Sequence, residues 1–210
     1  VANHAFVEVR RYGNAHKHVA KVEAIGHECD LALLEIEDDA FFQGAQPLEI
    51  GELPRLSRRV SVCGYPIGGE RLSITEGIVS RIELVSFAQS NRSLLAVQID
   101  AAINAGNSGG PVIEDGKLVG VAFQALDDAA QIGYMIAPEV VEHFLTDVDN
   151  DIHDGFPVLG ATTQLLESKA HRASLGLPAS NRDGVLITRV AYGGSAWGVL
   201  EEGDVLLAVD

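Results

Sequence analysis

Cysteine is scarce in this sequence: the 210 residues include two, Cys29 and Cys63. A disulfide framework requires several cysteines in a short chain, and a structural zinc site requires clustered Cys and His ligands. Two cysteines far apart supply neither. Cys29 beside an aspartate, and Cys63 at the end of an apolar run, are typical of small buried residues. We therefore expect neither a disulfide framework nor a metal site.

Basic residues are also few: 15 Lys and Arg stand against 30 Asp and Glu, giving a net charge of −15 at pH 7. Nucleic-acid-binding proteins neutralise phosphates with clustered Lys and Arg, and polybasic membrane anchors use the same residues. The charge therefore argues against both kinds of partner. A run of 18 or more apolar residues is missing as well, so we expect no membrane-spanning helix.

Glycine is plentiful, at 22 residues, and 47% of the residues are apolar. Short apolar or alternating segments are separated by Gly, Pro and Asp turn signals, a pattern typical of an all-β barrel or sandwich. The segment Asp30–Ile36 is almost continuously apolar, which predicts a strand covered on both faces. The expected strands are Phe6–Arg10, His18–Ile25, Asp30–Ile36, Val60–Pro66, Ser73–Glu83, Leu94–Ile99, Val112–Ile113, Leu118–Phe123 and Gly133–Ile136.

The hydrophobic period changes at Pro138–Leu145, where proline in a first turn and apolar spacing predict an amphipathic helix. The acidic stretch from Asp147 to Gly155 follows it. Its alternating aspartates superficially resemble a calcium loop, but Ile152 and Val158 stand where an EF-hand needs Gly and Glu, so we expect no calcium site. We assign 1–148 to a first domain, 149–155 to a linker and 156–210 to a second domain. The second domain is expected to hold a strand at 184–190, a helical piece opening at 195–197, and a strand within 200–210.

One loop-like run, Asp100–Pro111, places a serine among small and flexible residues. Gly106, Gly109 and Gly110 allow backbone angles closed to other residues. A catalytic serine needs an exposed hydroxyl and nearby N–H groups that hold a developing oxyanion, and such a run provides both. The alternative is a tight turn in a β protein, since Asn, Gly and Ser are ordinary turn residues.

The string Gly-Asn-Ser-Gly-Gly-Pro, preceded by Asp-Ala-Ala-Ile-Asn, resembles the nucleophile signature of the Deg/HtrA serine proteases. This resemblance implies a chymotrypsin-like double β-barrel, with the first barrel incomplete here. It makes Ser108 the nucleophile and the N–H groups of Gly106, Asn107 and Ser108 the oxyanion hole. The segment Cys29–Leu34 resembles the family's triad-aspartate string and implies that Asp30 orients the base. The alternative for Asp30 is an exposed turn acid before a strand.

The base that the resemblance implies is a histidine in a Thr-Asn-x-His-Val-Val string. The segment Val1–Val9 resembles the residues that come directly after that string in the family, and the chain opens and closes in mid-pattern. We therefore expect a piece of a longer protein whose triad histidine precedes Val1, and which is inactive by itself. His4 lies past the expected place. The other histidines belong to predicted turns, a helix, the linker or the second domain and have no motif: His16, His18, His27, His143, His153 and His171.

The resemblance also assigns substrate contacts. The strand Val121, Ala122, Phe123 and Gln124 would pair with the substrate main chain. Loops 104–107 and 124–132 would line the specificity pocket. Neither loop places a charge at the pocket's expected base, so we expect small or medium aliphatic side chains before the cut. The segments 65–69 and 85–94 match the family's activation loops.

The second domain resembles a permuted PDZ domain that is cut short. Its carboxylate-binding loop would be Phe156, Val158, Leu159 and Gly160, where backbone N–H groups capture a peptide C-terminus. Val158 departs from the family, in which an aromatic residue is common. The run Gly203–Asp210 resembles a PDZ strand. The alternative is a PDZ domain that docks on the protease and binds no peptide.

Together these motifs resemble the plant-type Deg branch and its bacterial relatives. They imply an ATP-independent serine endopeptidase that degrades unfolded or damaged proteins, needs no cofactor and forms a homo-oligomer, a trimer or a multiple of one. The location would be the periplasm or cell envelope in a bacterium, and the plastid or nucleus in a plant. The alternative is a non-proteolytic chaperone or peptide-binding scaffold of the same fold.

Overall fold

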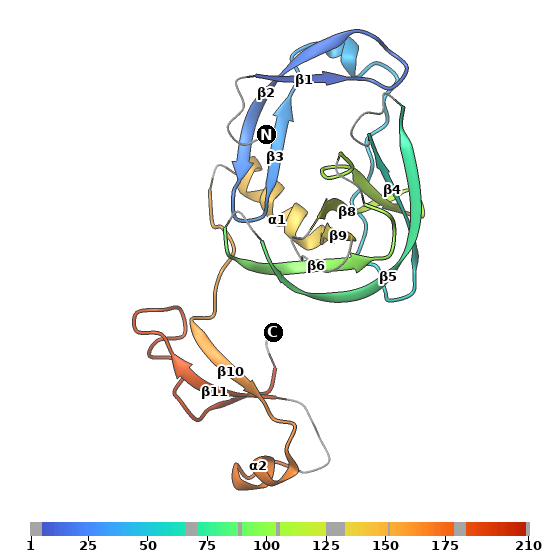
Figure 1. The fold of residues 1–210 in the computed structure, drawn as a ribbon. Helices are drawn as coiled ribbons and strands as arrows, with labels where there is room; N and C mark the ends of the chain where they lie inside the picture. Colours follow the sequence, from blue (N-terminus) through green and yellow to red (C-terminus); the bar gives the residue numbers. More distant parts are fainter. Residues whose placement is uncertain are drawn as a thin grey trace. The chain divides into compact units, whose positions relative to one another are not determined.

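The computed structural model describes residues 6–65, 71–87, 90–103, 106–124, 133–150, 152–178 and 184–208. The chain forms two compact units, Val1–Gly155 and Phe156–Asp210. The elements of each unit are labelled in Figure 1. The first unit contains a closed barrel, a separate three-stranded sheet and one α-helix, and the second contains a small sheet and a short helix.

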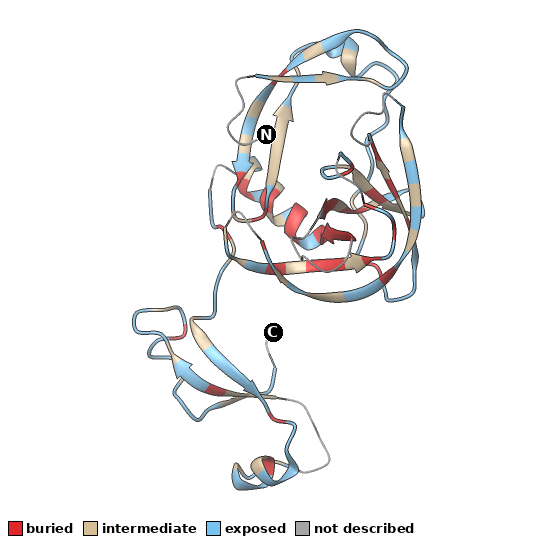
Figure 2. Ribbon diagram, in the orientation of Figure 1, coloured by how far each residue is buried: buried red, intermediate tan, exposed pale blue. Residues whose placement is uncertain are grey.

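Six antiparallel strands close into the barrel in the order β4-β5-β6-β9-β8-β7, with β4 paired to β7. Closure leaves no unpaired strand edge around the barrel. Val62, Val97 and Val112 of these strands are fully buried. Figure 2 shows that buried segments gather on the barrel strands and on the helix beside them. The chymotrypsin-like, all-β prediction is thus confirmed for this part. The strands are β4 (Arg59–Gly64), β5 (Ser73–Ser86), β6 (Ser93–Ile99), β7 (Pro111–Glu114), β8 (Lys117–Gln124) and β9 (Gly133–Ile136).

The helix α1 (Pro138–Asp149) begins with proline at its first position and buries Val140, Val141 and Phe144. It is longer than the predicted Pro138–Leu145, because residues 146–149 continue the helix to the first residue of the predicted linker 149–155. Asp147 can be buried there because its Oδ2 accepts the N–H of Gly155 at 3.1 Å. None of the helices in the described part of the chain has the length and hydropathy needed to cross a bilayer.

An antiparallel sheet of three strands, β1 (Val7–Arg10), β2 (Lys17–Gly26) and β3 (Leu31–Glu35), forms the other half of the first unit. The prediction that β3 is covered on both faces is wrong, since none of its residues is buried. The strand is apolar, but Leu31, Ala32 and Leu34 line a cavity instead of packing into a core, so β3 is not fully covered. A short 3₁₀ helix, η1 (Asp39–Phe41), follows β3 and was not predicted.

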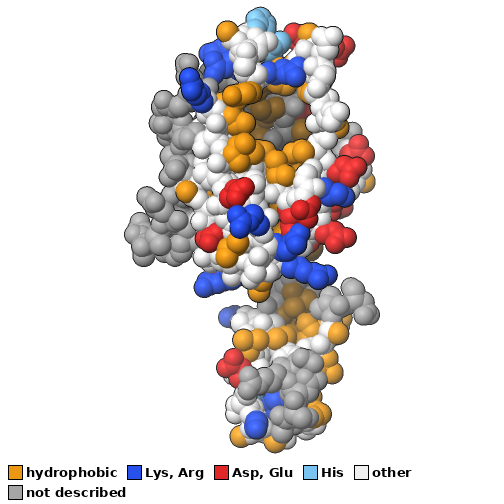
Figure 3. All heavy atoms as spheres, turned by 90° about the vertical axis from the view of Figure 1, so that its right-hand side faces the viewer, with side chains coloured by type: hydrophobic (Ala, Val, Ile, Leu, Met, Phe, Trp, Pro, Cys, Tyr) orange, Lys and Arg blue, Asp and Glu red, His pale blue; other side chains and the backbone are white. Residues whose placement is uncertain are grey.

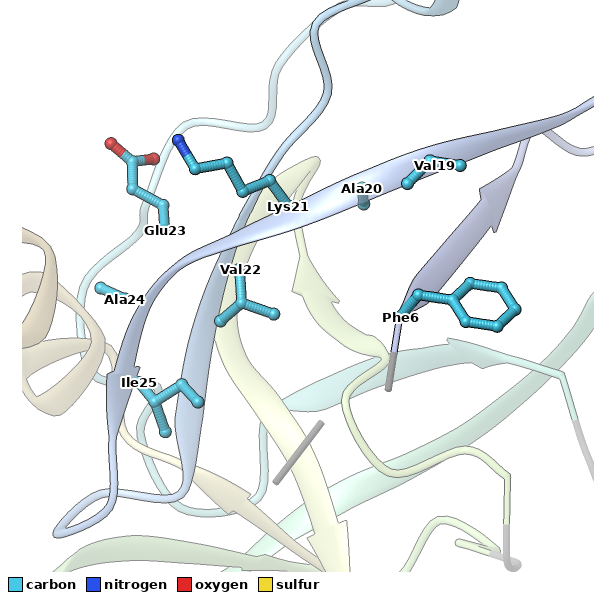
Figure 4. Close-up of a pocket in the computed structure, with 8 residues that line it drawn as sticks. All are labelled: Phe6, Val19, Ala20, Lys21, Val22, Glu23, Ala24 and Ile25. Atoms are coloured by element: carbon cyan, nitrogen blue, oxygen red, sulfur yellow. The ribbon is translucent and has the colours of Figure 1, made fainter. Parts of the chain in front are cut away.

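The register of β2 shifts between Val22 and Ala24, which marks a β-bulge. In a regular strand Val22 and Ile25 would point to opposite faces of the sheet, because they are three residues apart. The extra residue of the bulge brings both side chains to the same face. Figure 4 shows both side chains pointing away from Lys21 and Glu23. This part of β2 and the residue before β1 line a cavity of about 620 Å³, formed by Phe6 and residues 19–25.

The second unit has a sheet with the order β10-β11-β12, made of β10 (Ala161–Leu165), β11 (Val185–Val190) and β12 (Val205–Leu206), and a helix α2 (Lys169–Ser174). Leu166, Ile187 and Ala196 are its buried apolar residues. The predicted helical piece at 195–197 is wrong: this segment consists of turns. Glycines with φ of +71° and +77° at 193 and 198 flank it, and an α-helix cannot continue through such angles. Strand β10 and helix α2 were not predicted.

We expect Gly77→Ala to destabilise the first unit by about 3 kcal/mol, the upper range for overpacking. A Cβ on Gly77 would lie 2.2 Å from the backbone nitrogen of Ala101, where β5 crosses the start of the serine-containing segment. The matched control is Gly44→Ala, which has φ of +73° but no atom within 4 Å and should cost about 1 kcal/mol. Urea unfolding measures both, and equal losses would contradict the close contact at Gly77.

Candidate active site

The segment Gly106–Gly110 forms a tight loop that is docked on β8. The carbonyl of Asn107 accepts the N–H of Gly110 at 2.9 Å, closing a turn around Ser108. Gly109 has φ of +86°, the angle that the third residue of a type II turn requires. The N–H of Gly109 donates to the carbonyl of Ala122 at 2.8 Å, which ties the turn to the barrel.

The same loop packs on the end of β4 with no room for a further side chain. A Cβ on Gly110 would lie 2.0 Å from the carbonyl oxygen of Cys63, and one on Gly64 would lie 2.9 Å from the Cα of Asn107. Asn107 is therefore buried, with 1% of its surface exposed, while Ser108 beside it is exposed. The close contacts at Gly64 and Gly110 thus hold the loop against the barrel, while the side chain of Ser108 stays accessible to solvent.

The loop offers main-chain hydrogen-bond donors. Among the residues that the structure describes, the N–H groups of Gly106, Asn107 and Ser108 donate to no protein acceptor. Unused N–H groups next to a nucleophile are what the stabilisation of an oxyanion needs. The three N–H groups are thus unused among the described residues, and their role as an oxyanion hole stays a prediction.

Asp30 ends the four-residue turn between β2 and β3 and has φ of +56°, a left-handed angle that Asp tolerates better than most residues. The residue before it anchors the turn: Cys29 is 1% exposed and its N–H donates to the carbonyl of Gly26 at 3.2 Å. A Cβ on Gly26 would lie 2.7 Å from Cys29 Sγ and 2.8 Å from Phe144 of α1. The turn is thus packed on α1 on one side and presents Asp30 on the other.

The pKa of the Cys29 thiol is raised from its ordinary value of 9.0 to about 11, mainly by burial. Main-chain hydrogen bonds of Leu31 and Cys29 lower it, and the carboxylates of Asp30 and Glu28 add smaller increases. The thiol is therefore protonated at neutral pH. A protonated, buried thiol is a poor nucleophile and a poor metal ligand. Cys29 serves the site as a small apolar side chain that fixes the turn.

Asp30 and Ser108 line the same cavity, of about 450 Å³, between the three-stranded sheet and the barrel. Figure 3 shows that the first unit is hollowed on the side it presents and that hydrophobic side chains gather around the hollow. A mostly apolar wall with a few polar groups is typical of a binding site. The cavity is lined by Ile25, Gly26, His27, Asp30, Leu31, Ala32, Leu34, Ser108, Gly109 and Val121.

His27 lies on this cavity, but within the described residues no hydrogen bond or ion pair joins it to Asp30 or Ser108. His4 lies outside the described residues. The remaining histidines have contacts elsewhere: His18 Nδ1 lies 3.0 Å from Asp38, and His153 Nδ1 lies 3.4 Å from Asp147. Sequence reasoning did not find the place of His27 on the cavity, because the turn that carries it gives no motif.

Strand β8 borders the site at Val121, which lines the cavity. The main chain of Ala122 is already paired, its N–H donating to Gly110 at 2.9 Å and its carbonyl accepting from Gly109. Ala122 therefore has no main-chain group left for a substrate. Phe123, the next residue, directs its main-chain groups to the other side of the strand, where it is paired with Tyr134 of β9. Of the four residues, Gln124 remains for that role. Most of the specificity loops expected at 104–107 and 124–132, and the activation segment 66–69, lie outside the described residues.

In the second unit, the loop before β10 is held by its carbonyl groups. Those of Val158, Leu159 and Gly160 accept from Ser195 Oγ, from Ala196 N–H at 3.0 Å and from Ala191 N–H at 2.7 Å. In the part of this unit that the structure describes, the N–H groups of residues 158–160 donate to no acceptor. Strand β10 is also an edge of its sheet. Sequence reasoning missed Ser195 as the anchor of this loop.

The described residues contain no group of three or more His, Cys, Asp and Glu side chains placed to hold a metal ion.

Residues 2–121 match the family model described as a trypsin-like peptidase domain. The chain is 49% identical over 208 residues to "Protease Do-like 2, chloroplastic" and 46% identical over 211 residues to "Protease Do-like 4, mitochondrial", both of Arabidopsis thaliana. These matches cover 97% and 100% of this chain, and 34% and 40% of the relatives. The chain thus spans between a third and two fifths of the length of these relatives.

Among solved structures, the fold is similar to that of "HtrA-type protease AlgW with decapeptide", with a TM-score of 0.65 and 24% identity. The match covers 99% of this chain and 63% of that chain. At this identity the likeness concerns the fold. It extends over both units, so the barrel, the open sheet and the small second sheet recur together in another protein.

We expect the raised pKa of Cys29 to lower the stability of the first unit in alkaline solution. Below pH 9 the thiol is protonated in both states, but between about pH 9 and 11 it ionises only in the unfolded chain, so the free energy of unfolding falls as the pH rises. Other groups also titrate in this range, so the measurement is the difference between the parent protein and Cys29→Ala in urea unfolding at pH 8, 9 and 10. A constant difference over this range would contradict the prediction.

Proposed function

This chain belongs to the family of trypsin-like peptidase domains and is homologous to the Do-like (Deg/HtrA) serine proteases; on that premise we propose that it carries the peptidase site of a serine endopeptidase. The observation that carries the proposal is the placement of Asp30 and Ser108, from distant parts of the chain, on one cavity. The unused N–H groups beside Ser108 support it. A structural turn would need neither arrangement.

In the proposed reaction, Ser108 Oγ attacks the carbonyl carbon of a peptide bond as a histidine takes its proton. The negative oxygen that forms is held by the N–H groups of Gly106 and Ser108, with that of Asn107. The histidine then gives its proton to the leaving amine, and water hydrolyses the acyl-enzyme. Asp30 orients the histidine and stabilises its charged form. Since none of the described histidines contacts Asp30 or Ser108, we assign the base to a residue outside the described part of the chain.

We propose unfolded or damaged proteins as the substrates, in protein quality control. An extended, unfolded chain can add its main chain to a strand, and such pairing tolerates many sequences. The main chain of Gln124, which points to the side of β8 away from β9, together with the apolar cavity wall, fits extended substrates with aliphatic side chains. The proposed chemistry needs no cofactor. We propose a homo-oligomer, a trimer or a multiple of one, as the working form.

We propose that the second unit is a PDZ domain that binds peptide C-termini. Support comes from the loop 156–160, whose carbonyl groups are tied down while the N–H groups of residues 158–160 are unused among the described residues. Fixed N–H groups can hold a terminal carboxylate, and the edge strand β10 can pair with the peptide main chain. Val158 and Leu159 are exposed, which leaves apolar surface for the last peptide side chain.

In the full-length protein, we expect a fluorophosphonate probe to label Ser108, and Ser108→Ala to abolish the labelling. Asp30→Asn should slow it at least a thousandfold, because the base loses the carboxylate that orients it. The matched control is Asp115→Asn, which changes another left-handed aspartate, in the exposed turn between β7 and β8. A protein that binds unfolded chains but shows no labelling that depends on Ser108, even with added peptide or heat, would be a scaffold rather than a protease.

We also expect peptides with a free carboxylate to bind full-length Ser108→Ala protein at least tenfold more tightly than their amidated forms, as measured by fluorescence polarisation. Ser195→Ala should weaken this binding several-fold, because Ser195 anchors the carbonyl of Val158. Ser174→Ala, which removes a hydroxyl from α2, is the control. Equal binding of the free and amidated peptides would show that the second unit does not capture C-termini.

A further inference from the structure

We propose that Glu28 is a positioning residue for Asp30, through which the connection between β5 and β6 sets the orientation of that carboxylate. This inference rests on the proposed protease function. Glu28 lies two residues before Asp30 in the turn between β2 and β3, and it touches no part of the cavity that Asp30 and Ser108 share. Its effect on the reaction would pass through Asp30.

Two contacts join Glu28 to the connection between β5 and β6. The Ser90 hydroxyl donates to the main-chain carbonyl of Glu28 at 3.0 Å, and Arg92 Nη2 lies 3.4 Å from Glu28 Oε1. The side chains of Glu28 and Arg92 are about one-third exposed, at 35% and 32%. Such partial burial limits screening by solvent, so this pair holds its geometry better than a fully exposed pair does.

The described residues of this connection, 87 and 90–92, are joined by local contacts. The N–H of Phe87 donates to the carbonyl of Arg92 at 2.8 Å, and the N–H of Arg92 donates to Ser90 Oγ at 3.2 Å. The N–H of Asn91, whose φ is +55°, donates to the carbonyl of Phe87 at 2.8 Å. The hydroxyl and the guanidinium that reach Glu28 are therefore presented by a folded segment.

The other end of this connection reaches β8. Phe87 is 2% exposed and stacks on Phe123, with ring centroids 5.0 Å apart. Phe123 directly precedes Gln124, the residue of β8 whose main chain we assign to substrate pairing. Residues 87 and 90–92 of this connection thus contact both the turn that carries Asp30 and the strand that would hold the substrate.

Glu28 also lies next to Gly155, the last residue of the first unit. A Cβ on Gly155 would lie 3.2 Å from Glu28 Oε2. The N–H of Gly155 is held by Asp147, and its carbonyl lies 2.5 Å from His143 Nε2, so α1 fixes this residue through both main-chain groups. The residue that precedes the second unit is therefore fixed against the side chain that positions Asp30.

Asp30 needs such support because its left-handed backbone is unfavourable by about 1–3 kcal/mol and persists only where the surroundings impose it. Burial of Cys29 fixes one side of the turn, and the contacts of Glu28 fix the main chain just before it. A small displacement of an orienting group lowers a reaction rate steeply, up to about 100-fold for 1 Å. The loss of Glu28's contacts should therefore slow the reaction without unfolding the unit.

The test compares full-length Glu28→Gln, Arg92→Gln and the double variant by their rates of fluorophosphonate labelling from pH 5 to 9. We expect each single variant to label about tenfold more slowly, and the double variant to be no slower than either. A reversed pair, Glu28→Arg with Arg92→Glu, should recover part of the rate. The acid limb of the pH profile should move to lower pH, because a loosely held Asp30 stabilises the protonated base less, and the pKa of that base falls.

The control is Glu76→Gln, which breaks the pair of Glu76 with Arg59 (3.0 Å) on the barrel and should leave the rate and the profile unchanged. Melting temperatures of all variants separate positioning from unfolding. The inference is overturned if Glu28→Gln labels like the parent protein, or if its rate falls with no shift of the acid limb. If the parent protein itself shows no labelling that depends on Ser108, the proposed protease function fails first.

Discussion

The site depends on a close contact between two main-chain segments, the serine loop and the end of β4. At the points of contact, Gly110 in the loop and Gly64 in β4, there is no room for a Cβ. Gly110 meets the carbonyl of Cys63, and Gly64 meets Asn107. Because β4 belongs to a closed barrel, the loop is packed against a strand that is hydrogen-bonded on both sides. Asn107 is pulled inward and Ser108 is left outside, so the exposure of the hydroxyl follows from the burial of its neighbour.

The turn that carries Asp30 is held in a different way from the serine loop. Asp30 lies in a turn of an open sheet, where no barrel closes around it. Its support comes from the buried Cys29, from Gly26, which packs closely against Phe144 of α1, and from the side chains of Ser90 and Arg92. The serine is thus fixed by main-chain contacts that few substitutions could alter, and the aspartate by side-chain contacts that can change. Adjustment of the site is therefore expected on the aspartate side.

Local pattern was enough to predict much of the fold. The barrel strands and the start of α1 follow from alternation, turn residues and an N-terminal proline, which act over a few residues. The segments that carry Ser108 and Asp30 can be recognised in the sequence because each resembles a short family motif. Both residues line one cavity in the structure. The failures have a common cause in contacts between distant residues. The end of α1 depends on Asp147 meeting Gly155, and the burial of β3 depends on what packs on its faces, one of which lines a cavity. The segment 195–197 is helical in its own composition, but the glycines around it impose turns.

Glu28 carries no signal in the sequence, because its contacts too are with distant residues. An acidic residue in a hairpin turn is ordinary, and its importance lies in partners about 60 residues later in Ser90 and Arg92, and still later in Gly155. None of these contacts has a spacing that a motif could encode, because the barrel and α1 bring the segments together. The residues proposed for the chemistry thus lie in two short sequence motifs. The contacts proposed to orient Asp30 form between segments that come together only when the chain folds. The two aspects can therefore change separately, since substitutions around Glu28 would alter the orientation of Asp30 without touching the nucleophile.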